Sequence, residues 1–386
     1  MERRQNRVPI RPEIARVEAY VPGESLDAFS ARTGVPRDRL IKLNSNESPY
    51  PPSPRVSRAL GDHTAYNLYP DPDGHELIAA IAGYGGVDPR HLVLANGSNE
   101  LITQLWRVFI GAGESVVTCS PTFSLYTTAT TLAGGTLINV PRGDDYALDV
   151  PGILAALRDD TRLIVVCSPN NPTGNLAAPE EVDALLATGR IVVVDEAYIE
   201  FAGDDALAAS PIARVPQHEN LVVLRTFSKW AGLAGLRLGY GAFPEWLVPH
   251  VRTVQLPFEV NLAAHLAARE TLADLPLLRE RIGGLIEERD RLYALLAAQP
   301  YLRVFPSRGN FLLVELTDPR LSVADFRAAM EGAGIILRYF RTPDLACHVR
   351  LTVGAPEHTD AIAAVLDTLA ESLGVRAAVP AGALVR

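Results

Sequence analysis

The chain has 386 residues, of which 48% are hydrophobic and 21% charged, so it can bury a core large enough for two domains and is not a disordered protein. No uncharged apolar run approaches the roughly 18 residues that a membrane-spanning helix needs. The net charge of −9 argues against a nucleic-acid partner, because binding to phosphates requires a basic surface.

The N-terminal residues Met1–Glu13 are basic, and no apolar segment follows them as it would in a signal peptide. The three cysteines are an odd number in a long chain, and Cys119 and Cys167 end apolar runs, as reduced core cysteines do. We therefore expect a cytoplasmic protein. Residues 1–45 are expected to form an N-terminal arm that contains Tyr20.

Seven short apolar runs follow, separated by segments with helical periodicity. Runs rich in Val, Leu and Ile are typical of strands buried on both faces of a sheet. The pattern predicts an α/β fold whose large domain, residues 46–265, has a mostly parallel seven-stranded sheet covered by helices. The expected strands are His91–Asn96, Ser115–Ser120, Thr136–Pro141, Arg162–Ser168, Arg190–Asp195, Asn220–Arg225 and Leu238–Phe243, and the helices between them include Ser98–Ile110, Pro151–Arg158 and Pro179–Ala187.

After Asn261 the pattern changes to a long helix, Pro276–Gln299, whose Arg and Glu residues indicate a solvated face. This helix is expected to link the large domain to a smaller α+β C-terminal domain, residues 266–376, followed by a loose tail at 377–386. The elements expected there are strands Leu302–Phe305, Asn310–Leu316, Ile335–Tyr339 and His348–Val353 and helices Val323–Gly332 and Glu357–Leu373.

Of the 36 basic residues only two, Lys42 and Lys229, are lysines. A lysine amine can lose its proton near neutral pH and form an imine with an aldehyde, whereas a guanidinium stays charged. A chain that uses arginine almost everywhere is thus expected to keep lysine where arginine cannot serve.

Three consecutive predicted strands end in polar residues, which are Asn171, Asp195 with Tyr198, and Lys229. In open α/β sheets ligands bind outside the carboxyl ends of the strands, so these side chains are expected to converge. Singly, Asp195 is also consistent with a helix cap, Asn171 with a turn and Tyr198 with a core aromatic residue.

Together these four residues match the needs of pyridoxal phosphate. Lys229 would bind its aldehyde, Asp195 would keep the ring nitrogen protonated, and Asn171 and Tyr198 would bind the ring oxygen. Phe123 follows another strand end and would stack on the ring, although core packing also explains it. We expect Lys229, Asp195 and Tyr198 to be catalytic.

The phosphate of the cofactor would lie where a strand turns into a helix at Gly97, Ser98 and Asn99, since a helix N-terminus offers backbone N–H groups and a positive dipole end. Helix capping is an alternative role for Ser98 and Asn99. Further donors to the phosphate are expected from a set near Lys229, namely Thr226, Ser228 and Arg237.

The chain resembles the fold type I pyridoxal-phosphate aminotransferases, and among them the histidinol-phosphate aminotransferase family, over nearly its whole length. It departs from the family at 354–358 and at Trp230. The segments that carry the resemblance are 42–49, 69–72, 168–174, 195–198, 228–229, 234–237, 309–311, 338–340 and 350–354. The resemblance implies a homodimer in which Tyr69 reaches the cofactor phosphate of the neighbouring subunit, although a tyrosine beside Pro70 also suits a turn.

Arg338 and Arg350 lie on neighbouring predicted strands and can present two planar forks to a carboxylate or a phosphate. We expect histidinol phosphate as the amine substrate, with 2-oxoglutarate and glutamate as the keto–amino pair of the other half-reaction. Tyr20 and Asn46 are expected to be polar partners of the imidazole ring of histidinol phosphate. Arg338 is also consistent with a structural ion pair.

An aromatic amino-acid aminotransferase is the nearest alternative function, and a phosphothreonine-type decarboxylase is a more distant one. A non-catalytic pyridoxal-phosphate-binding regulator is the alternative from another class, although no room is left for a basic DNA-binding module. No metal site is expected, because the histidines and cysteines show no ligand spacing.

Overall fold

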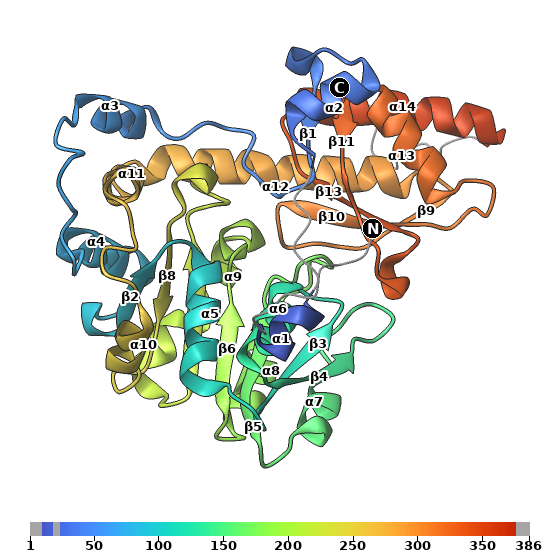
Figure 1. The fold of residues 1–386 in the computed structure, drawn as a ribbon. Helices are drawn as coiled ribbons and strands as arrows, with labels where there is room; N and C mark the ends of the chain where they lie inside the picture. Colours follow the sequence, from blue (N-terminus) through green and yellow to red (C-terminus); the bar gives the residue numbers. More distant parts are fainter. Residues whose placement is uncertain (1–9, 18–23, 376–386) are drawn as a thin grey trace.

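The computed structural model describes residues 10–17 and 24–375, so Tyr20 and the expected tail at 377–386 lie outside the described residues. The described chain forms a large domain around one sheet and a smaller C-terminal domain around another (Figure 1). No helix in these two ranges is long and apolar enough to cross a membrane.

The large sheet contains all seven strands that the apolar runs predict, in the order β2-β8-β7-β6-β5-β3-β4. Strand β8 runs antiparallel to both of its neighbours, and the other strands are parallel to one another. The predicted α/β fold with a mostly parallel sheet is confirmed. The strands are β2 (Leu92–Ala95), β3 (Ser115–Ser120), β4 (Thr136–Pro141), β5 (Thr161–Cys167), β6 (Ile191–Asp195), β7 (Leu221–Thr226) and β8 (Gly239–Ala242).

Alternate residues along the central strands pack into two hydrophobic cores on opposite faces of this sheet. Val192 and Val194 of β6 belong to one core, and Val193 belongs to the other. Helices cover both faces, which explains why the strands are continuous apolar runs. The first core is covered by α3 (Pro54–Asp62), α4 (His75–Gly85), α7 (Val150–Ala156), α8 (Pro179–Leu186) and α11 (Leu262–Leu272), and the second by α5 (Ser98–Phe109), α6 (Leu125–Ala133) and α10 (Val248–Val254).

The long helix α12 (Leu275–Ala297) joins the two domains, as Figure 1 shows. Its Leu278 and Leu285 pack into the first core of the large domain, whereas Leu292 and Leu296 pack into the core of the small domain. The small domain has an antiparallel sheet in the order β12-β13-β10-β9. Its elements are β9 (Leu302–Val304), β10 (Phe311–Leu316), α13 (Val323–Gly332), β12 (Arg338–Tyr339), β13 (His348–Thr352) and α14 (Pro356–Leu373).

The structure divides the single strand expected at Ile335–Tyr339 into two. Strand β11 (Ile335–Ile336) pairs in parallel with β1 (Ile41–Lys42), whereas β12 pairs with β13. The pairing of β11 with β1 attaches the end of the N-terminal segment to the small domain. Leu43, which follows β1, is buried in the core of that domain.

The remaining elements are short or peripheral. They are α1 (Pro12–Arg16), α2 (Leu26–Thr33), α9 (Asp204–Ala208) and the 3-10 helices η1 (Arg37–Arg39), η2 (Pro89–His91), η3 (Ile199–Ala202), η4 (Pro211–Gln217), η5 (Ala234–Leu236) and η6 (Pro343–Leu345).

Candidate active site

Polar side chains gather at the carboxyl edge of the large sheet, where β5, β6 and β7 end. Asp195 is the last residue of β6, Tyr198 lies three residues on, and Lys229 follows β7. The Lys229 Nζ atom lies 6.0 Å from the centre of the Tyr198 ring, so the lysine and the tyrosine share one site.

The Lys229 amine donates a hydrogen bond of 2.9 Å to the carbonyl oxygen of Ser45. Burial lowers the pKa of Lys229 to about 8, and the positive charge of Arg350 acts in the same direction, while Glu47 opposes it. An appreciable part of this amine is therefore unprotonated near neutral pH, which is the form that attacks an aldehyde. The other lysine, Lys42, forms an ion pair with Glu47.

Asp195 is buried, and each of its carboxylate oxygens accepts a hydrogen bond. The Tyr126 hydroxyl donates to Oδ2 at 2.7 Å, and the Ala197 N–H donates to Oδ1 at 3.2 Å. Burial raises the pKa of Asp195 to about 6, and these two donors partly oppose the shift. Because this value lies below 7, the carboxyl remains mostly ionised at neutral pH.

Tyr126 is not among the residues expected from the sequence. It lies in the first turn of α6, three residues after Phe123, which precedes the helix. No local pattern pointed to Tyr126, because its bond to Asp195 joins residues that are 69 apart in the chain. The half-buried Phe123 ring meets the Tyr126 ring edge-on, with 5.8 Å between centres, and Tyr126 stacks on Trp106.

Tyr198 is linked through Asn46 to the small domain. The Asn46 amide Nδ2 donates to the Tyr198 hydroxyl oxygen at 3.1 Å, and the hydroxyl of Thr352 donates to Asn46 Oδ1 at 3.1 Å. Burial raises the pKa of Tyr198 to about 12. Asn46, which was expected to contact substrate, is hydrogen bonded within the protein at both ends of its amide and keeps a second N–H hydrogen to donate.

The two arginines expected to bind an anion stand opposite each other on β12 and β13, where Arg338 pairs with Arg350. Directly opposed residues of a sheet point to the same face, so the structure brings these side chains together. Arg350 donates to Asn171 Oδ1 at 2.5 Å and to the carbonyl of Asn44 at 2.8 Å. Within the described part of the chain, Arg338 forms no hydrogen bond or ion pair with a described residue.

The start of α5 packs closely against β8 and against the side chain of Arg237. Gly97 caps the helix with a φ of 90°, and a Cβ atom there would collide with the Arg237 guanidinium. A Cβ atom at Gly239 would collide with the backbone of Gly97 and Ser98. Arg237 donates to the Ser228 hydroxyl at 3.1 Å.

Thr226 completes this cluster, because its hydroxyl accepts the Ser228 N–H at 3.1 Å. Backbone N–H groups, two hydroxyls and a guanidinium thus meet at one helix N-terminus. Asn99, in the first turn of the same helix, is exposed, and Ser98 is buried.

Tyr69 lies outside this cluster in the described chain. Its side chain is 79% exposed, and its ring stacks on Phe258 with 4.3 Å between centres. Leu68 and Leu256 are also exposed. We call these four exposed apolar side chains, Leu68, Tyr69, Leu256 and Phe258, the Tyr69 patch.

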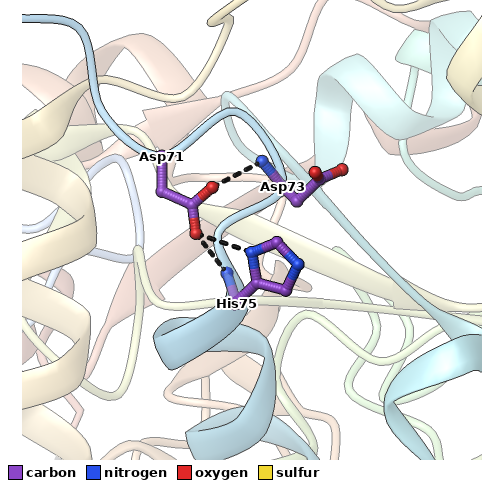
Figure 2. A group of neighbouring side chains, drawn as sticks. All are labelled: Asp71, Asp73 and His75. Carbon is purple, nitrogen blue, oxygen red and sulfur yellow. Dashed lines mark hydrogen bonds and ion pairs between the residues drawn. The ribbon is translucent and has the colours of Figure 1, made fainter.

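Asp71, Asp73 and His75 form a group of exposed potential ligands beside Tyr69 in sequence (Figure 2). Asp71 accepts hydrogen bonds of 2.9 Å from both the backbone N–H and the ring Nδ1 of His75, and a third from the N–H of Asp73. These bonds hold the pKa of Asp71 at about 2. The bond from the backbone N–H of His75 satisfies one of the donors left without a partner at the start of α4.

The family described as "Aminotransferase class I and II" matches residues 38–369. The histidinol-phosphate aminotransferase of Roseiflexus castenholzii is 42% identical over 368 residues, which cover 94% of this chain and 98% of that protein. The chloroplastic histidinol-phosphate aminotransferase 1 of Arabidopsis thaliana is 36% identical over 354 residues, which cover 92% and 84%. Among solved structures, the histidinol-phosphate aminotransferase of Sinorhizobium meliloti in complex with pyridoxal-5'-phosphate has a TM-score of 0.83 and 28% identity, with 94% and 98% of the two chains covered.

Proposed function

The chain belongs to the class I and II aminotransferase family, and from this premise we propose that it uses pyridoxal phosphate to transfer an amino group from histidinol phosphate to 2-oxoglutarate. The observation that carries the cofactor assignment is the meeting of Lys229, Asp195 and Tyr198 at the edge of the sheet. The choice of histidinol phosphate as the substrate is supported by the similarity to histidinol-phosphate aminotransferases.

The residues present fit the cofactor. The phosphate would bind at the start of α5, where a Cβ atom at Gly97 or Gly239 would fill the cradle, with Ser98 and Asn99 offering N–H groups. The hydroxyls and the guanidinium that complete this cradle belong to Thr226, Ser228 and Arg237. When bound, pyridoxal phosphate supplies an aldehyde that takes up amines and a ring that accepts electrons from the substrate.

The protein's own groups have distinct tasks around the ring. Lys229 would hold the cofactor through Nζ, and its free amine would move a proton at the substrate carbon that carries the amino group. The Asp195 carboxylate would accept a hydrogen bond from the protonated ring nitrogen, and Phe123 would stack on the ring. Tyr198 and Asn171 would donate hydrogen bonds to the ring oxygen.

Arg338 and Arg350 would bind the anionic end of each substrate, since one pair of guanidinium forks fits phosphate and carboxylate alike. This supports the use of one pocket for histidinol phosphate and for glutamate. In this arrangement residues 46–265 hold the cofactor and residues 266–376 carry the substrate arginines. Tyr20 remains a proposed partner of the imidazole and lies outside the described residues.

We also propose a homodimer with shared sites, in which Tyr69 contacts the cofactor phosphate of the neighbouring subunit. The exposure of the Tyr69 patch supports this, because large apolar side chains at a surface favour an interface. All three cysteines are unpaired, as is usual in the cytoplasm, which is the location that we propose.

The test is a panel of amines scored by loss of the visible absorption band of the purified, cofactor-loaded protein. Histidinol phosphate is expected to bleach the band far more efficiently than phenylalanine or tyrosine, and Arg350→Ala is expected to impair both half-reactions. A preference for the aromatic amino acids would identify an aromatic aminotransferase instead. A band that no amine bleaches would indicate a non-catalytic regulator.

The two lysines supply a matched control for the attachment site. Lys229→Arg is expected to abolish the visible band, whereas Lys42→Arg, which leaves Lys229 as the single lysine of the chain, should retain it. A band that survives in Lys229→Arg would overturn the cofactor assignment.

A further inference from the structure

Asn46 lies where the N-terminal segment passes between the two domains, and it bonds with both. It is 1% exposed and has a φ of 53°, a left-handed conformation that asparagine adopts more readily than most residues. Its backbone N–H donates to the Thr352 hydroxyl oxygen at 3.0 Å, and its carbonyl accepts from the Asn310 amide at 3.2 Å. The backbone of Asn46 is thereby anchored to the small domain.

The side-chain amide of Asn46 has a defined direction. Because the Thr352 oxygen already accepts the backbone N–H of Asn46, its own hydrogen is free to go to Asn46 Oδ1, 3.1 Å away. This interaction favours the orientation with the carbonyl end of the amide toward Thr352 and the NH2 end toward Tyr198.

In the Tyr198 hydroxyl, the oxygen acts as a hydrogen-bond acceptor toward Asn46, and the hydrogen remains available for another partner. The oxygen accepts from Asn46 Nδ2 at 3.1 Å, so the hydroxyl hydrogen is left to point elsewhere. Burial raises the pKa of Tyr198 to about 12, so the phenol keeps this hydrogen at neutral pH. The Phe311 ring meets Tyr198 edge-on, with 5.0 Å between centres, and helps to fix the phenol ring.

We propose that Thr352 and Asn46 are positioning residues that make the Tyr198 hydroxyl a dedicated hydrogen-bond donor to the ring oxygen of pyridoxal phosphate. The inference rests on the proposed function, because it takes that cofactor as the ligand. It gives Asn46 a task directed at the cofactor in addition to the substrate contact expected from the sequence.

Strand β13 carries several of the residues that form hydrogen bonds near the proposed site. His348, Arg350 and Thr352 alternate along it and so lie on one face. His348 bonds to the Tyr146 hydroxyl at 3.0 Å, Arg350 bonds to Asn171, and Thr352 bonds to Asn46. The strand that carries a proposed substrate arginine thus also orients a donor to the cofactor.

The test uses the pH midpoint of the visible band in the cofactor-loaded protein, which reports how readily the nitrogen of the Lys229 linkage gains a proton. A donor to the ring oxygen lowers that midpoint. Tyr198→Phe should raise it by about one pH unit, the shift expected when one hydrogen bond to a charged group is lost. Thr352→Val should raise it by roughly half a unit, because the released amide can turn and accept the Tyr198 hydrogen.

A double variant separates positioning from a general structural effect. If Thr352 acts through Tyr198, Thr352→Val should add no further shift in the Tyr198→Phe background. Thr352→Ser, which keeps the hydroxyl, should restore the midpoint. Thr271→Val is the control, because it removes a buried hydroxyl elsewhere, in α11, which donates to the carbonyl of Ala267, and it should leave the midpoint unchanged.

Equal shifts in the two backgrounds, or no shift in Thr352→Val, would overturn the proposal. Asn46→Asp provides a second variant should Thr352→Val fold poorly, since a carboxylate cannot donate to Tyr198 and should shift the midpoint as far as Tyr198→Phe does. A wild-type protein that forms no visible band with pyridoxal phosphate would instead refute the proposed function itself.

Discussion

The carboxylate of Asp195 is stabilised in a buried position by two neutral donors, Tyr126 and the N–H of Ala197. Neutral donors oppose the effect of burial only in part, which leaves the pKa of Asp195 at about 6. The ionised form, which the proposed role of Asp195 at the cofactor ring nitrogen requires, is therefore favoured by the Tyr126 hydroxyl.

We expect Tyr126→Phe to weaken cofactor binding by roughly tenfold, the effect of losing one hydrogen bond to a charged group. Without this donor the pKa of Asp195 rises further, so more of the carboxyl is protonated at pH 6 than at pH 8. The loss should accordingly be larger at pH 6. Titration of the apoprotein with pyridoxal phosphate at both pH values measures it.

Tyr301→Phe is the control for this prediction. Tyr301 is fully buried in the small domain, and its hydroxyl donates to the carbonyl of Leu366. The variant should lose stability but bind the cofactor normally at both pH values. A similar loss of affinity in the two variants would contradict a specific role for Tyr126.

At the scale of elements, the contact between β8 and the start of α5 determines the shape of the proposed phosphate cradle. Gly239 lets the backbone of Gly97 and Ser98 approach the strand. The same contact brings Arg237 and Ser228 to the helix N-terminus. Gly239, which has no side chain, thus determines where the donors Arg237 and Ser228 lie relative to the helix N-terminus.

Gly239→Ala should displace the start of α5, because the added methyl group would meet backbone atoms that cannot move alone. We expect a loss of about 1–3 kcal/mol of folding free energy, as is usual for overpacking, together with weaker cofactor binding. Thermal unfolding and cofactor titration measure the two effects.

Gly283→Ala in α12 is the matched control, since nothing lies within 4 Å of a Cβ atom there. Alanine favours a helix over glycine by up to about 1 kcal/mol, so this variant should be neutral or slightly more stable. Normal cofactor affinity in Gly239→Ala would argue against the cradle.

At the scale of the whole molecule, the proposed dimer predicts that two inactive variants can complement each other. In Lys229→Ala the cofactor has no attachment, and in Tyr69→Ala the contact to the partner's cofactor is missing. Equal mixing with subunit exchange should give mixed dimers with one intact site each, or about a quarter of all sites. Activity measured before and after exchange tests this, and no recovery after verified exchange would count against shared sites.

The pH dependence of folding stability is a second property of the whole molecule. Burial raises the pKa of Glu200 to about 8 in the folded protein, against an ordinary value of 4.5, and the Arg225 charge opposes this only in part. The folded state then binds more protons than the unfolded state between these values. Folding stability should therefore fall as the pH rises from about 4.5 to about 8.

Glu200→Gln should flatten this dependence, and the slope that remains should include the contribution of Asp195, whose pKa is raised in the same direction. The melting temperature of the apoprotein between pH 5 and pH 8 is the measurement. Glu245→Gln, at an exposed position, should keep the wild-type slope. An unchanged slope in Glu200→Gln would contradict the assignment.

The sequence by itself determined the strands, the fold class and the polar residues at the strand ends. These features are local, because a continuous apolar run predicts a buried strand wherever the strand lies in the sheet. The scarcity of lysine pointed to Lys229 without knowledge of the fold, because the argument depends only on the chemistry of the lysine amine. The family assignment, which the comparisons confirm, followed from such local motifs.

Only the tertiary structure decided which residues meet across long distances in the chain. The reversed direction of β8, the division of Ile335–Tyr339 between two partners and the bond from Tyr126 to Asp195 all depend on pairings that periodicity does not encode. Asn46 illustrates the point, because its hydrogen-bonding partner Thr352 lies 306 residues away. The direction of an amide is determined by the groups that surround it, and those groups come together only when the chain is folded.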